Sequence, residues 1–319
     1  MAVDPAQPQP SPPSSPENAP NEPTQSQTPE PAALATPSST SLSENFAAAI
    51  TFLLPIGRRK TFGPTEAVPN PVSWIVPIGL LIGLIWAGSF RLSWRLYGEI
   101  GSLRVLPSLT VVLVECIFTG SFLALGLART AHVLTGRQPF RVQTDRMIPL
   151  SPVGTLVLCL IVMVEFFLIL SIDDRPGWWP PPNDWRYHFN FMYPHPIYRP
   201  LLLAPIWGRW GILLAATIGQ TARDSDAETV ALNRAMSPGR LLLHALLPLC
   251  LTAIYCSRSR NYLTGVIIGM LVFGITYVVT VAIARRGGGQ SRQSLFAAGQ
   301  IAQLAFLAVY RAFWRLIDG

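Results

Sequence analysis

The chain has 319 residues, of which 50% are hydrophobic and only 13% are charged, and its mean hydropathy is +0.37. This composition is too apolar for an ordinary soluble domain. The net charge of +7 comes from Arg and Lys residues that stand singly or in pairs between apolar runs. Cations spread in this way are typical of the loops of membrane proteins, so we expect membrane lipid as surroundings and no nucleic-acid partner.

Residues 1–45 are expected to form a disordered tail. They are mostly Pro, Ser, Thr, Gln, Glu and Ala, and none of them is aromatic. Such a segment cannot bury enough apolar surface to offset the entropy lost on ordering. Residues 46–319 are expected to form a single membrane domain.

The apolar runs predict an all-α fold, a polytopic helical bundle with six or seven transmembrane helices. Residues 46–56 (FAAAITFLLPI) are too short to cross a bilayer, so we expect them to lie in the interface. The later runs approach the roughly twenty residues that a crossing needs, and they are apolar on all sides. They lie near residues 72–90, 105–128, 153–172, 200–220, 240–256, 263–284 and 295–312.

Arg and Lys are more numerous on the side of the membrane that carries the N-terminus. By the positive-inside rule, this predicts a multi-pass protein of the inner (cytoplasmic) membrane with a cytoplasmic N-terminus. The loops after the second, fourth and sixth spans would then share the cytoplasmic face.

Ionisable residues inside the predicted spans are costly in lipid and therefore need partners. Glu115 and Glu165 lie in the second and third spans, and Arg209 lies in the fourth. A pair between two helices, such as Glu165 with Arg209, would offset the cost of burial. A path for protons or ions is the functional alternative.

The three loops assigned to one face carry polar residues in an unusual order. They contain GLARTAH (residues 126–132), TARDSDAE (221–228) and RRGGGQSRQ (285–293). The glycines of the last segment form a flexible turn whose backbone could approach a phosphate closely, although a plain linker has the same composition.

The order of these features resembles the cobalamin synthase family, the adenosylcobinamide-GDP ribazoletransferases. The family's signature reads roughly T-G-G-x-H-x-D-G-L-A-D-T-x-D-G, and the resemblance runs from about Phe46 to the C-terminus. The chain matches the signature at Thr119, Gly120, Gly126, Leu127, Ala128 and Thr130. Further matches are Leu54 and Pro55, Pro77 with Gly79 and Gly83, Arg146 and Gly154, Arg209, Ala222 with Arg223 and Asp224, and Gly288, Gly289, Ser291, Leu295 and Ala297.

The resemblance implies a particular reaction. The family joins a GDP-activated corrinoid to α-ribazole or its phosphate, releases GMP, and depends on Mg²⁺. Carboxylates must hold that metal, which neutralises the charge on the phosphoryl oxygens.

The acids of the family's motifs are largely replaced in this chain. Leu and Met cannot bind Mg²⁺, Arg repels it, and Gln coordinates a hard cation poorly. The resemblance therefore implies a diverged member that no longer performs the transfer and serves as a binding or assembly partner, of a nucleotide-activated corrinoid or of an active family member. The replacing residues are Leu123 for the His, Leu125, Arg129 and His132 for three Asp, Met147 for the acid of an R-D-S step, Arg292 and Gln293 for a G-D pair, and Gln300 and Gln303 for two Glu.

Two alternatives stay open for the polar loops. Asp145, Asp224 and Asp226 could supply displaced metal ligands, so that the transferase remains active, or they could be solvated loop charges. A metal-free phosphate site is the second possibility. Its arginines can equally be explained as positive-inside loop charges. The residues of this candidate site are Arg129, Arg146, Arg223, Arg292, Gly288 and Gly289. An unrelated small transporter with an accidental resemblance is the remaining hypothesis for function.

Overall fold

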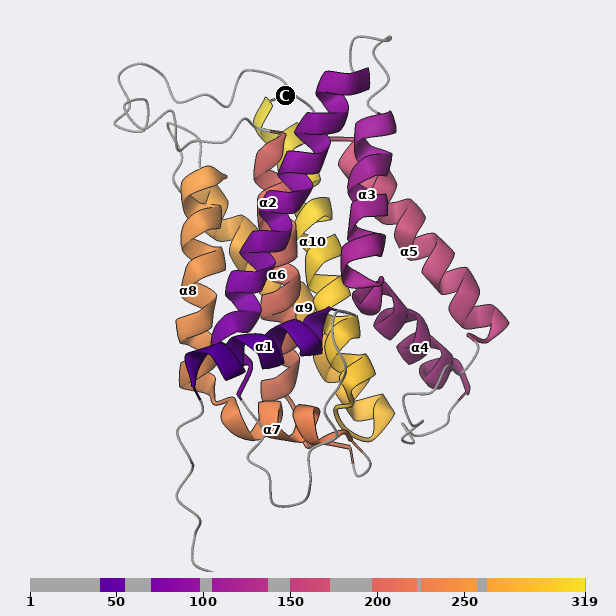
Figure 1. Ribbon diagram of the computed structural model, residues 1–319, viewed down its shortest axis with the longest axis vertical. Coiled ribbons are helices and arrows are strands. Elements are labelled where there is room, and N and C mark those ends of the chain that lie inside the picture. Colours follow the sequence, from indigo (N-terminus) through magenta and orange to yellow (C-terminus); the bar gives the residue numbers. More distant parts are fainter. Residues whose placement is uncertain are drawn as a thin grey trace, which may run out of the picture. The chain divides into compact units, whose positions relative to one another are not determined.

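The structure is a computed structural model that describes residues 41–54, 70–97, 105–136, 150–172, 197–222, 225–256 and 263–318. These residues are helical apart from short connections and one isolated β-bridge, which confirms the predicted all-α class (Figure 1). The helices of the described residues are α1 (Leu42–Leu53), α2 (Val72–Tyr97), α3 (Val105–Thr119), α4 (Phe122–Gly136), α5 (Pro152–Leu170), α6 (Tyr198–Thr217), α7 (Ala227–Ala235), α8 (Pro238–Tyr255), α9 (Leu263–Gly287) and α10 (Arg292–Asp318).

Six helices of the described residues are long and apolar enough to cross a membrane, and the bent pair α3–α4 would be a seventh crossing. The predicted range of six or seven is therefore confirmed. The second span was expected to be continuous over residues 105–128, and this is wrong. The helix bends by 81° between Thr119 and Phe122.

Two successive residues in the left-handed conformation cause this break. Gly120 has φ +59° and Ser121 has φ +54°. A right-handed helix cannot continue through such dihedral angles. Hydropathy does not detect the break, because it reports side-chain polarity and not backbone conformation.

Helix α1 begins earlier than the apolar segment that predicted it. Ser41 caps the helix, and its side chain and that of Glu44 form a reciprocal capping box. The helix therefore includes Leu42 to Asn45, which we had assigned to the tail. Figure 1 shows α1 lying across the long helices, as expected for an interfacial segment. The rest of the tail lies outside the described residues.

Helix α6 forms the centre of the bundle and is buried along almost its whole length, between α2 and α10 (Figure 1). Glycines allow the close approach of the three helices. A Cβ added to Gly83 of α2 would collide with the carbonyl oxygen of Leu202, and one on Gly211 would lie 2.7 Å from the Cβ of Ala302 in α10. Small residues at helix contacts are typical of membrane bundles, where close packing replaces the hydrophobic effect.

Candidate functional site

The small residues of the signature segment hold α4 against its neighbours. A Cβ on Gly126 would lie 2.5 Å from the Cβ of Phe296 and 2.9 Å from the carbonyl oxygen of Gln293, both on α10. Ala128 and Thr130 are fully buried, and a Cβ on Gly154 of α5 would contact the carbonyl oxygen of Ala128. Gly126, Ala128 and Thr130 of the signature segment therefore serve helix packing in this chain.

Three of the positions where the family resemblance implies a metal ligand lie on one face of α4. Leu125, Arg129 and His132 follow one another at spacings of four and three residues, which places them on the same side of a helix. Leu125 and Arg129 are half-buried and His132 is exposed, while Leu123 is buried near Gly299. Met147, Arg146 and Asp145 lie outside the described residues.

Arg292, at the start of α10, is held by three kinds of contact, which are ion pairs, a hydrogen bond to a carbonyl and cation–π contacts. Its Nη1 donates to Asp226 Oδ2 at 3.2 Å and to Glu228 Oε2 at 2.9 Å. Its Nη2 donates to the carbonyl oxygen of Phe52 at 2.7 Å. The guanidinium carbon lies 4.5 Å from the centre of the Phe52 ring and 5.4 Å from that of Phe296.

These contacts join two of the predicted site residues that had been assigned to different sites. Arg292 was a phosphate candidate and Asp226 a metal candidate, and the structure pairs them with each other. The Arg292 side chain is only 10% exposed, whereas those of Asp226 and Glu228 are 33% and 18% exposed. The cluster also fastens α1 to the bundle, because Phe52 lies in the last turn of α1.

The glycine turn before α10 packs against another part of the same chain. Gly288 has φ +71° and Gly289 has φ +130°. The amide of Gly289 donates to the carbonyl of Ala284 at 3.2 Å, and a Cβ there would lie 2.9 Å from the carbonyl oxygen of Gln220. Gly289 is thus needed for close packing, whereas nothing lies within 4 Å of a Cβ on Gly288.

A short parallel bridge fixes the segment that follows. Thr221 pairs with Gln290. The amide of Ala222 donates to the carbonyl of Gln290 at 2.9 Å, and the amide of Gln290 donates to the carbonyl of Gln220 at 2.8 Å. The loop after α6 is therefore brought beside the glycine turn, as the grouping of polar loops predicted. Arg223 and Asp224 lie outside the described residues, so the phosphate site remains a prediction.

A buried polar network crosses the centre of the bundle, and sequence reasoning found only part of it. Glu165 and Arg209 were expected to pair directly, but Gln303 lies between them. Arg209 Nη1 donates to Gln303 Oε1 at 3.0 Å, and Gln303 Nε2 donates to Glu115 Oε1 at 2.9 Å and to Glu165 Oε1 at 2.7 Å. Gln300 Nε2 donates to Glu165 Oε2 at 3.2 Å.

This network gives the two glutamines a role that the sequence interpretation missed. They had been seen only as lost family acids, yet they bind the carboxylates of two other spans. Their spacing of three residues places them on one face of α10, and this was the signal that could have linked them to Glu115 and Glu165. His244 is half-buried on α8, and none of the hydrogen bonds of this network includes it.

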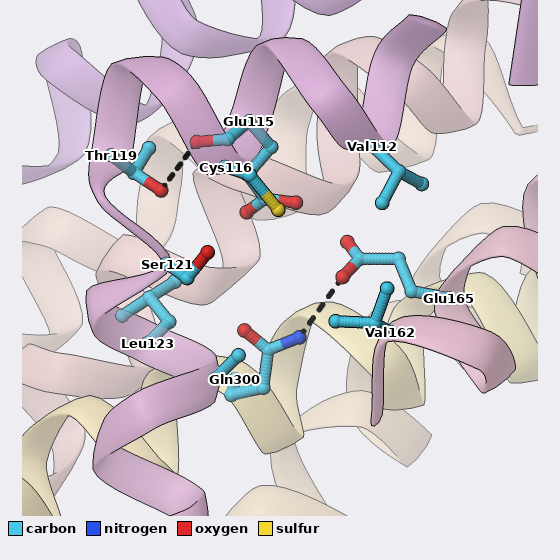
Figure 2. A pocket seen from close by; sticks show the side chains of 10 residues that line it. Val112, Glu115, Cys116, Thr119, Ser121, Leu123, Val162, Glu165 and Gln300 are labelled. Atoms are coloured by element: carbon cyan, nitrogen blue, oxygen red, sulfur yellow. Dashed lines mark hydrogen bonds between the residues drawn. The ribbon is translucent and has the colours of Figure 1, made fainter. Parts of the chain in front are cut away.

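A pocket opens beside this network, at the break between α3 and α4 (Figure 2). The space that it encloses is small, with room for about one water molecule. Its apolar lining comes mainly from Val112, Leu123 and Val162. Its polar lining comes from Glu115, Cys116, Thr119, Ser121, Glu165 and Gln300.

The residues described do not fit the magnesium ion of the family's reaction. In the described parts of the chain, no group of three or more His, Cys, Asp or Glu side chains is placed to hold a metal ion. Asp226, the candidate ligand that the structure describes, is occupied by the guanidinium of Arg292. Mg²⁺ prefers several oxygen ligands in octahedral geometry, which a guanidinium in the same place prevents.

The fold and these side chains together define a multi-pass helical membrane protein with a charged core. A family model described as cobalamin-5-phosphate synthase matches residues 45–310. The chain belongs to this family, because the match includes nearly all of the membrane domain. The hypothesis of an unrelated transporter with an accidental resemblance is therefore wrong. No curated protein and no solved structure matches the chain significantly.

Proposed function

We propose that this protein is a diverged member of the cobalamin-5-phosphate synthase family that does not perform the Mg²⁺-dependent transfer. It binds a corrinoid or a nucleotide-activated corrinoid, or assembles with an active family member, at the cytoplasmic side of the inner membrane. The observation that carries this proposal is the closed cluster of Arg292 with Asp226 and Glu228.

The chemistry of the cluster supports the loss of the transfer. In the family, a G-D pair precedes the last span, and this chain has Arg292 and Gln293 there. The guanidinium supplies a permanent positive charge next to the position of the family's acid, which is Gln293 in this chain. A divalent ion entering beside it would be repelled, and Asp226 would have to give up its partner first.

The face of α4 supports binding of an anionic group without metal. Arg129 is half-buried and His132 is exposed on the same side of the helix. An arginine on a rigid helix donates several hydrogen bonds to a phosphate or diphosphate and keeps its charge at every physiological pH. Binding of the activated corrinoid can therefore persist although the metal ligands are replaced.

Complementation tests this proposal in cells. The full chain is expressed in bacteria that lack their own cobalamin synthase, and completed cobalamin is measured beside an intact family member that carries all its acids. We expect the intact member to restore cobalamin and this chain to leave it at background. Restoration by this chain would show an active transferase with displaced ligands and would overturn the proposal.

A further inference from the structure

The first two turns of α8 carry two basic side chains on one edge of the helix. Arg240 lies in the first turn and is exposed, and His244 lies one turn further along and is half-buried. A spacing of four residues places the two side chains one above the other. Positive charge and hydrogen-bond donors are therefore gathered at the beginning of a helix that is long and apolar enough to cross the membrane.

No acid of the described residues balances this edge of α8. The sequence has no Asp or Glu between Glu228 and Asp318, and Asp226 and Glu228 both bind Arg292. Neither Arg240 nor His244 forms an ion pair with another described residue. The helix itself adds to the imbalance, because its beginning carries partial positive charge.

A structural role explains part of this arrangement. Arg240 Nη1 donates to the carbonyl oxygen of Ala235 at 2.6 Å, and Ala235 is the last residue of α7. The bond satisfies one of the carbonyls that the end of a helix leaves without a partner. A guanidinium has five N–H donors, and among the described residues the Arg240 side chain makes this hydrogen bond only. His244 forms no hydrogen bond with a described residue, so capping of α7 does not explain it.

Beyond His244 the same edge of α8 is apolar. Leu247 and Leu251 follow at spacings of three and four residues, and both are half-buried. Figure 1 shows α8 on the outside of the bundle, where lipid reaches this edge. From Arg240 to Leu251 the helix rises about 16 Å, close to the roughly 15 Å of hydrocarbon in one leaflet. The edge therefore has a polar end and an apolar length that match one phospholipid molecule.

We propose that this edge of α8 binds one anionic phospholipid. Arg240 and His244 hold the phosphate of its headgroup, and an acyl chain lies along Leu247 and Leu251. Arginine donates paired hydrogen bonds to phosphate oxygens, and an imidazole donates one in either protonation state. Basic sites beside transmembrane helices recognise anionic headgroups in this way.

The charge of the headgroup decides which lipid fits. Phosphatidylglycerol carries one net negative charge, which balances Arg240, whereas phosphatidylcholine brings a cation of its own beside the two basic side chains. The site is separate from Arg292 and from the pocket at the helix break, and it does not depend on the proposed function.

Lipid binding to the purified full chain in detergent is the test. The chain is stripped of lipid, mixed with phosphatidylglycerol or with phosphatidylcholine of the same acyl chains, and examined by native mass spectrometry. We expect one phosphatidylglycerol per chain to bind at a concentration at least about fivefold lower than phosphatidylcholine requires. Equal affinity for the two lipids would overturn the proposal.

Matched variants locate the headgroup. Arg240→Gln removes the charge and keeps an amide that can donate to Ala235, and we expect the preference for phosphatidylglycerol to disappear. His244→Leu should weaken phosphatidylglycerol binding by a smaller factor. Arg95→Gln makes the first change at an exposed position in the last turn of α2 and should leave the preference unaltered.

A purely structural Arg240 gives a different result. If it only caps α7, Arg240→Gln lowers the thermal unfolding midpoint without lipid but keeps the preference for phosphatidylglycerol, and the proposal fails. Should Arg240→Gln fail to fold, the wild-type titration and His244→Leu still decide.

A soluble phosphate is the other source of the same anionic group, and competition separates the two. Glycerol phosphate carries the headgroup anion without acyl chains. We expect about a hundredfold excess of it to leave the lipid bound, because the acyl chains keep the lipid in the micelle at the surface of the protein. Displacement of the lipid would show a site for soluble anions and would overturn the proposal.

Discussion

Replacing Arg292 by methionine tests whether its cluster holds α1 and α7 on the bundle. Met keeps an unbranched apolar side chain between the rings of Phe52 and Phe296, but it removes the hydrogen bonds to Phe52, Asp226 and Glu228. We expect a large loss in the free energy of unfolding, together with loosening of α1.

The magnitude follows from the exposure of the groups that remain. Breaking a fully buried ion pair costs about 3–5 kcal/mol, whereas exposed pairs contribute about 0–1 kcal/mol. The side chains of Asp226 and Glu228 are 33% and 18% exposed, so both can be partly rehydrated and the ionic contribution is about 1–2 kcal/mol. The charged hydrogen bond to Phe52 adds about 1.5 kcal/mol and the ring contacts about 0.5–1 kcal/mol. We expect a loss of roughly 3–4.5 kcal/mol.

Two measurements on the full chain in detergent check this prediction. The free energy of unfolding is obtained by denaturant titration, and hydrogen exchange of the α1 amides reports local opening. Arg234→Met, on the exposed side of α7, is the control. A difference of less than about 0.5 kcal/mol between the two variants, with unchanged exchange in α1, would refute the reasoning.

Three further predictions concern packing and the buried network, and thermal unfolding measures each. Gly126→Val should lower the free energy of unfolding by about 1–3 kcal/mol, since its Cβ would lie 2.5 Å from a side chain of α10. Gly88→Ala, with no atom within 4 Å of its Cβ, should raise the free energy of unfolding by up to about 1 kcal/mol. Gly289→Ala should lower the free energy of unfolding more than Gly288→Ala. Both residues have positive φ, but only a Cβ at Gly289 lies against backbone atoms. Equal losses of stability in the two variants would contradict this close approach. Gln303→Leu leaves three buried charged groups without a shared partner and should cost about 3–5 kcal/mol; a loss below about 1 kcal/mol would show that the network contributes little.

The course of the chain through the membrane could be predicted from the sequence because long apolar runs are local features. The break at Gly120 and Ser121 could not, since it depends on two backbone dihedral angles within an apolar run. The early start of α1 was missed for a related reason. A capping box at Ser41 and Glu44 extends a helix into polar sequence that composition alone assigns to a tail.

The candidate site was harder to predict, because its contacts join residues far apart in the chain. Arg292 and Asp226 were both selected from the sequence, but 66 residues separate them, and nothing local indicates that one neutralises the other. The glutamates of the spans were expected to need a partner, and they have one. That partner is Gln303, which had been interpreted only through the acid that the family has at its position.

Product formation by the purified protein tests the central claim most directly. The full chain is incubated with GDP-activated corrinoid and α-ribazole while Mg²⁺ is titrated, and the release of GMP is followed beside an active family member. We predict release no faster with Mg²⁺ than in the presence of a chelator. Saturable, Mg²⁺-dependent release that disappears in Asp226→Asn would contradict the account.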